Sequence, residues 1–138
     1  MTRALLVITF TTLLVSSDAF ARAASDLPFS VGDAYSAAVR FVRVDRACVV
    51  TDKDPDAAFL TFECKDDDKV KHGALEIFKT RVEGRDGVRL QVALGDDPHY
   101  VELRFLELLE RKLREERGNP PPLPAPAKKP PPPDAGTN

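Results

Sequence analysis

The two cysteines are the side chains whose chemistry the sequence constrains most. Cys48 and Cys64 are the only cysteines among 138 residues, and an Asp-Pro-Asp turn sequence lies between them. A β-hairpin centred on Asp56 places Val50 opposite Phe62, and it brings the two cysteines face to face. Directly opposed residues lie within the distance that a disulfide spans. We therefore predict a disulfide in an exported protein, with two buried free thiols as the alternative.

The acidic residues of this hairpin also have the spacing of a calcium-binding loop. Asp52, Asp54 and Asp56 alternate, and Glu63 lies where a twelve-residue loop starting at Asp52 would place its bidentate glutamate. The sixth position is Ala57, however, where the sharp turn of such a loop needs glycine, and the flanking segments resemble strands rather than helices. We predict a solvated acidic turn, and an exported calcium-binding module is the alternative.

Motifs for catalysis or cofactor binding are missing from the sequence. It contains no G-x-S-x-G, HExxH, CxxC or phosphate-binding loop. Neither His72 nor His99 has a cysteine or carboxylate at a recognised ligand or catalytic spacing. A disulfide would also leave no thiol nucleophile. We predict a non-enzymatic protein without a cofactor, and a hydrolase whose site is assembled from distant residues is the second alternative.

Residues 1–23 have the organisation of a cleavable secretory signal. One arginine precedes about a dozen uncharged residues (4–15), and small residues suited to signal-peptidase cleavage follow. Asp18 interrupts the apolar segment before it reaches the roughly 20 residues that a membrane-spanning helix needs. We predict cleavage after Ala23, with Ala21 as the second site. The mature protein would then reside in a periplasm or outside the cell, without a membrane span.

Charge restricts the class of partner. The chain has 20 basic and 22 acidic residues, with both signs interspersed. Nucleic-acid binding usually requires a basic stripe, and attraction to an anionic membrane requires a basic cluster, but neither occurs. A protein or a component of the cell envelope is therefore the expected partner.

The segment after the signal predicts a single α+β domain over residues 24–118. A helix is expected from Asp33 to about Arg43, with Ser30 as its N-cap. A final helix is expected between an N-cap at Asp97 and a stop at Gly118. Alternating apolar residues predict four strands between the helices. The segments are residues 48–51, 58–64, 73–82 and 88–94, with a polar loop over 65–72 and a turn over 83–87.

Short connections between these strands favour antiparallel neighbours. The predicted fold is a two-layer α-β-β-β-β-α sandwich, in which a four-stranded meander carries both helices on one face. The other sheet face would be polar and solvated, with Glu63, Glu76, Arg89 and Gln91. This face and the exposed side of the last helix are the expected binding surfaces of a small interaction or accessory domain.

Residues 119–138 differ in composition from the rest and contain long proline runs. Such a segment is expected to be an extended polyproline II spacer without a packed core. A docking motif of the PxxP type, with Lys128 and Lys129 adding charge, is the alternative.

Overall fold

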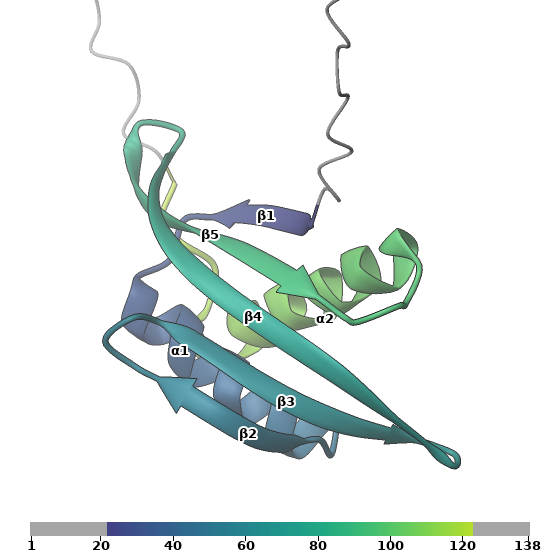
Figure 1. Ribbon diagram of the computed structural model, residues 1–138. Helices are drawn as coiled ribbons and strands as arrows, with labels where there is room; N and C mark the ends of the chain where they lie inside the picture. The colour runs from purple at the N-terminus through teal and green to yellow at the C-terminus, as the bar shows by residue number, and fades with distance from the viewer. Residues whose placement is uncertain (1–21, 123–138) are drawn as a thin grey trace, which may run out of the picture.

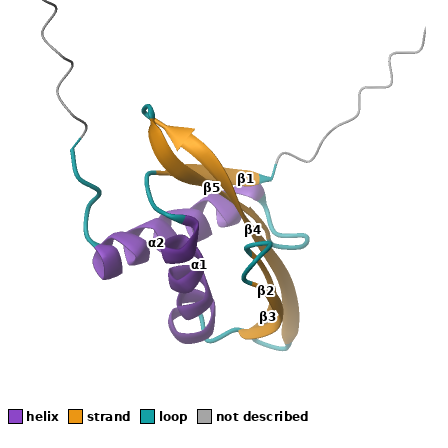
Figure 2. Ribbon diagram, turned by 90° about the vertical axis from the view of Figure 1, so that its left-hand side faces the viewer, coloured by secondary structure: helices purple, strands orange, loops and turns teal. Residues whose placement is uncertain are grey.

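The computed structural model describes residues 22–122, and its strands form one antiparallel sheet in the order β1-β5-β4-β3-β2 (Figure 1). Both helices lie on the same side of this sheet, as Figure 2 shows, so the two-layer α+β arrangement is confirmed. Most of the predicted signal segment and most of the proline-rich tail lie outside the described residues. The elements are β1 (Ala23–Leu27), α1 (Val31–Arg40), η1 (Phe41–Asp45), β2 (Val49–Asp54), β3 (Phe59–Asp66), β4 (Lys69–Val82), β5 (Arg85–Ala93) and α2 (His99–Arg117).

The predicted four-stranded meander is incomplete, because β1 adds a fifth strand. β1 pairs antiparallel with β5 from Ala23 opposite Val92 to Leu27 opposite Val88. Ala23 and Leu27 are buried, and α2 packs beside the strand. The element order is therefore β-α-β-β-β-β-α. None of the described helices is both long and apolar enough to cross a membrane.

The first helix begins as predicted but ends differently. The side chain of Ser30 accepts a hydrogen bond from the backbone N–H of Asp33, which confirms the N-cap. The α-helix then gives way to the π-helical turn η1, in which the N–H of Arg46 donates to the carbonyl of Phe41 at 2.9 Å. Phe41 and Val42, the first two residues of this turn, are both buried.

The β2–β3 hairpin has the predicted register at one end only. Val50 lies opposite Phe62 as expected, but Asp52 pairs with Thr61, one residue out of the predicted register. Thr51 is the additional residue, which makes a β-bulge in the edge strand. A bulge shifts the alternation by one position, but β2 beyond it consists of Asp52, Lys53 and Asp54, so no apolar pattern is present to reveal the shift.

The prediction of a polar loop over residues 65–72 is also wrong. β3 and β4 continue into it and are joined by a two-residue turn at Asp67 and Asp68. Backbone pairing extends there because ladder hydrogen bonds do not require apolar side chains. The turn predicted over residues 83–87 likewise shortens to Glu83 and Gly84, whose positive φ angles suit a tight hairpin.

The last helix starts one residue later than predicted, with Pro98 rather than Asp97 as its N-cap. The carboxylate of Asp97 instead contacts the ammonium group of Lys71 on β4 at 3.1 Å. Gly118 ends the helix with a φ of 78°, as expected.

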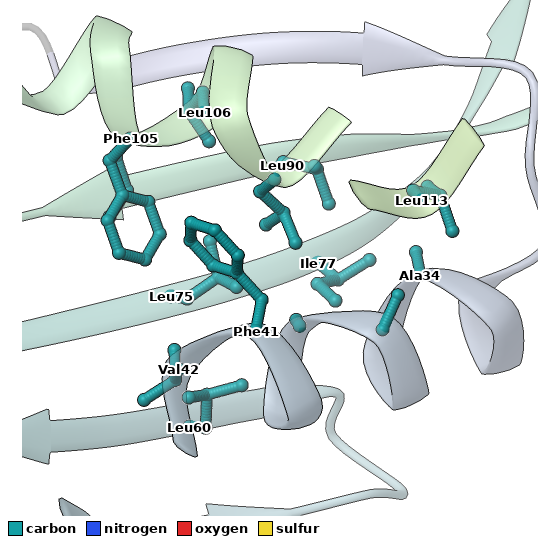
Figure 3. Close-up of a cluster of buried hydrophobic side chains, with 14 of the residues drawn as sticks. Ala34, Phe41, Val42, Leu60, Leu75, Ile77, Leu90, Phe105, Leu106 and Leu113 are labelled. Atoms are coloured by element: carbon teal, nitrogen blue, oxygen red, sulfur yellow. The ribbon is translucent and has the colours of Figure 1, made fainter. Parts of the chain in front are cut away.

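The core lies between the sheet and the two helices (Figure 3). The ring of Phe105 on α2 packs edge-on against Phe41, with 5.1 Å between centroids, and stacks on Phe62 of β3 at 5.6 Å. This aromatic group connects both helices to the sheet. The fully buried larger side chains are Leu60, Phe62, Leu75, Leu90, Leu109, Leu113, Val42, Val88 and Val92.

Replacing Gly73 by alanine is expected to destabilise the protein by about 1–3 kcal/mol. A Cβ atom at this position would lie 2.3 Å from the ring of Phe62, which is enclosed in the core. Urea unfolding should show this loss, and Phe62→Leu in the same chain should reduce the cost of Gly73→Ala. Gly32→Ala is the matched control, because a Cβ there meets nothing within 4 Å. Equal unfolding midpoints for Gly73→Ala and the wild type would contradict the packing described.

Candidate functional site: two concave surfaces beside the disulfide

The predicted disulfide between Cys48 and Cys64 is present, with 4.4 Å between the Cα atoms. It joins the chain entering β2 to the neighbouring strand β3. The backbone N–H of Cys48 also donates to the carbonyl of Val42 in η1 at 2.9 Å. The bridge therefore fixes η1 and the start of β2 relative to β3, and a concave surface lies on each side of it.

The predicted calcium ligands are not brought together. The Asp54 carboxylate accepts hydrogen bonds from the backbone N–H groups of Asp56 and Ala57, at 2.9 and 3.0 Å, and thereby closes the turn. Asp52 accepts from the N–H of the next residue. Glu63 lies on β3 against His72, at 3.3 Å. Within residues 22–122 no group of three or more acidic, histidine or cysteine side chains is arranged to hold a metal ion.

The first concave surface, here called the β2 groove, runs along the outer edge of β2. Its volume is about 530 Å³. Arg43 of η1 forms one wall, and the strand itself forms the other. The lining residues are Arg43, Cys48, Val49, Val50, Thr51, Asp52 and Lys53.

The backbone of Val50 is available for hydrogen bonding in this groove. The short Cα separation of Cys48 and Cys64 is that of a non-hydrogen-bonded antiparallel pair. Two residues further along, Val50 and Phe62 form a pair of the same kind. The N–H and C=O groups of Val50 therefore point away from β3. Since β2 is the last strand of the sheet, they point into the groove.

Apolar and cationic side chains flank this open backbone. Val49 of β2 lines the groove and is 63% exposed, and Val50 beside it is partly buried. Among the described residues, Arg43 forms no ion pair. The groove thus combines free backbone groups, aliphatic surface and an uncommitted guanidinium group, the components that recognise an extended acidic segment.

The polar sheet face, which the sequence favoured as a binding surface, has its main charges paired internally. Arg89 contacts both carboxylate oxygens of Asp26, at 2.7 and 2.8 Å, and these hydrogen bonds lower the pKa of Asp26. Arg22 pairs with Glu76 at 2.9 Å. On α2, the other expected surface, the exposed apolar residues are Tyr100 and Leu103.

The second concave surface, here called the sheet–α2 pocket, lies between the β3–β4 hairpin and the first turns of α2. Its volume is about 300 Å³. Apolar side chains line it together with a ring of charged residues. The lining residues are Arg46, Phe62, Cys64, Lys65, Asp66, Lys71, His72, Leu94, Asp97, Val101 and Phe105.

A buried carboxylate that the sequence did not single out fixes one wall of this pocket. Glu102 on α2 is largely enclosed, and it accepts a hydrogen bond from the backbone N–H of Leu94 at 3.1 Å. Its other oxygen lies 3.3 Å from Nδ1 of His99. The chain between β5 and α2 is therefore held against the helix, which keeps Leu94 at the pocket wall.

Comparisons with known proteins identify no family for this chain. No family model matches it, and no curated protein is similar to it. Among solved structures, CalU16 from Micromonospora echinospora is similar, with a TM-score of 0.48 and 14% sequence identity. The alignment covers 72% of this chain and 74% of CalU16. A similarity of this extent carries no argument about function.

Proposed function

We propose that this protein is a small exported interaction domain that binds an extended, acidic segment of a protein partner along β2. The observation that carries the proposal is the unpaired backbone of Val50 in a groove beside the free guanidinium group of Arg43. An added strand would exchange backbone hydrogen bonds with Val50, as in other cases of β-strand addition. Its side chains on one face would contact Val49, and an acidic residue could reach Arg43.

The bulge at Thr51 limits how this edge can be used. Bulges and charged residues on an edge strand disfavour continuous pairing, and β2 has both, with Asp52 and Lys53 after the bulge. A long strand, including β2 of a second copy, would lose its register there. A short partner segment anchored at Val50 avoids the problem. The edge is therefore suited to a short docking segment.

Replacing Arg43 by glutamine is expected to weaken peptide binding about tenfold, because a charge-assisted hydrogen bond is lost. The probe is an eight-residue peptide of alternating valine and glutamate, titrated into ¹⁵N-labelled protein while amide chemical shifts are followed. Shifts should concentrate at residues 49–53. A valine–lysine peptide should bind more weakly still.

Val50→Pro supplies a second, independent variant. Proline at position 50 removes the N–H that points into the groove. It removes no hydrogen bond to β3, and edge strands tolerate proline. This variant should keep the fold and lose peptide binding. Arg46→Gln, which changes another unpaired arginine outside the groove, is the matched control. If both Arg43→Gln and Val50→Pro bind the peptide as the wild type does, strand addition at β2 is refuted.

Export is the other part of the proposal. The disulfide supports it, since such bridges persist in oxidising compartments.

The position of β1 bears on the cleavage site. Cleavage after Ala23, the site that the sequence favours, would remove a residue that is 1% exposed and pairs with Val92. Cleavage after Ala21 would keep Ala23 and leave Arg22 beside Glu76. We therefore infer cleavage after Ala21.

The mature protein from an exporting host is expected to begin at Arg22 and to resist thiol alkylation until it is reduced. Intact mass measurement tests both points. Ala19→Gln places a large residue three positions before this cleavage site, so it should block cleavage there. The same substitution should not affect cleavage after Ala23. An N-terminus at Ala24, or an uncleaved chain with two free thiols, would contradict the inference.

A further inference from the structure

We propose that the sheet–α2 pocket binds a small monocarboxylate with a compact apolar body, held by Arg46 at the pocket rim. This site is separate from the β2 groove and does not depend on the function proposed for that groove. It rests on three features of the pocket, which are its floor, its size and the charges that remain available.

The floor of the pocket is apolar and preformed. Phe62 and Phe105 stack with 5.6 Å between ring centroids and an interplanar angle of 7°. Leu94 and Val101, each only partly buried, continue this surface toward the opening. Because these side chains come from β3, from α2 and from the end of β5, the floor needs no rearrangement to receive a ligand. Such preformed apolar pockets with few polar groups are typical ligand sites.

The size of the pocket limits the ligand. A volume of about 300 Å³ corresponds to roughly ten water molecules at about 30 Å³ each. A ligand of about ten non-hydrogen atoms would therefore fill it. An aryl or branched aliphatic acid has this size, whereas a long lipid chain would extend into solvent.

Several charged side chains around the pocket form ion pairs with one another. The ammonium group of Lys71 lies 2.8 Å from the carboxylate of Asp66 and 3.1 Å from that of Asp97. Hydrogen bonds to the two carboxylates raise the pKa of Lys71, and the hydrogen bond from Lys71 lowers that of Asp66, so Lys71 and Asp66 stay charged and paired. They also join the β3–β4 hairpin to the start of α2, which closes one side of the pocket.

Two lining cations, Arg46 and Lys65, have no ion pair among the described residues, and the better carboxylate partner of the two is Arg46. Its planar guanidinium group can bind both oxygens of a carboxylate. A ligand ammonium group would lack a partner, since Lys71 occupies both nearby carboxylates. The site should therefore select acids without an amino group.

The probe for this site is 3-phenylpropanoate, which has eleven or so non-hydrogen atoms, at the size limit set above. Titration into the ¹⁵N-labelled mature protein at low salt should give saturable shifts at the amides of Leu94, Val101 and Phe105. The neutral 3-phenylpropanamide and the amino acid phenylalanine should each bind at least about tenfold more weakly, because one lacks the carboxylate and the other carries an ammonium group.

Two variants make the test specific. Arg46→Gln should weaken 3-phenylpropanoate binding about tenfold and leave the peptide titration at β2 unchanged. Arg43→Gln should have the opposite pattern, so failure at one site is distinguishable from failure at the other. Val101→Phe should fill the opening and abolish binding while Arg46 is retained. Absence of saturable shifts, equal binding of the acid and the amide, or wild-type affinity in Arg46→Gln would overturn the proposal.

Discussion

Replacing Phe105 by alanine is expected to lower the free energy of unfolding by about 3–5 kcal/mol. Its ring is 4% exposed and contacts both Phe41 and Phe62. Removing it leaves a cavity where α1, α2 and the sheet meet, and the rigid surroundings can collapse only partly. Domains of this size are stable by about 5–15 kcal/mol, so most of the stability of the protein could be lost.

Urea unfolding followed by far-UV circular dichroism measures this effect. Leu103→Ala is the matched control, because Leu103 is on the same helix and 47% exposed, and it should change stability by no more than about 0.5 kcal/mol. Phe105→Leu retains most of the volume and should cost less than the alanine substitution. If Phe105→Ala and Leu103→Ala unfold at the same urea concentration, the aromatic group does not hold the two layers together.

The parts of the fold that the sequence predicts correctly are those with strict local patterning. In β5, Val88, Leu90 and Val92 alternate with polar residues, and all three are buried. The cysteines oppose each other because the same alternation sets the hairpin register at their end. The register near the turn could not be predicted in this way, because β2 is polar after the bulge at Thr51 and has no apolar alternation there.

β1 shows a different limit. Its sequence, Ala-Ala-Ser-Asp-Leu, has few β-branched or aromatic residues, and it follows directly on a segment typical of signal cleavage. Pairing with β5, more than sixty residues away in sequence, makes it a strand. Such non-local pairing overrides weak local propensity. The extension of β3 and β4 into polar sequence has a different origin, since the backbone ladder of this hairpin continues through Lys65 and Asp66 whatever their side chains.

The two candidate sites were not predictable for a related reason. Both depend on η1, whose π turn places Arg43 on the β2 groove and Arg46 on the sheet–α2 pocket. The sequence contains one indication of this turn, because the spacing of Val42 and Val44 departs from helical periodicity. The sequence does not indicate which of the two concave surfaces each arginine lines. That depends on how η1 packs against β2.

Replacing Cys48 and Cys64 together by alanine is expected to lower the free energy of unfolding by about 3 kcal/mol, the value for a loop of about 15 residues. The cysteines are separated by 16 positions, so the bridge restricts the unfolded chain to about this extent. Urea unfolding of the wild type under reducing conditions should give the same midpoint as the double variant. The double variant itself should not respond to the reductant, which provides the control.

Removing the bridge should also weaken both proposed binding sites, because it anchors the segment that contains Arg43 and Arg46. Cys48 lines the β2 groove and Cys64 lines the sheet–α2 pocket. A folded double variant should therefore bind both the valine–glutamate peptide and 3-phenylpropanoate more weakly. Gly87→Ala, whose Cβ would lie 2.6 Å from the carbonyl oxygen of Leu27 and away from both sites, separates this effect from general destabilisation. If the double variant keeps wild-type affinity for both probes, the disulfide stabilises the fold but does not position either arginine.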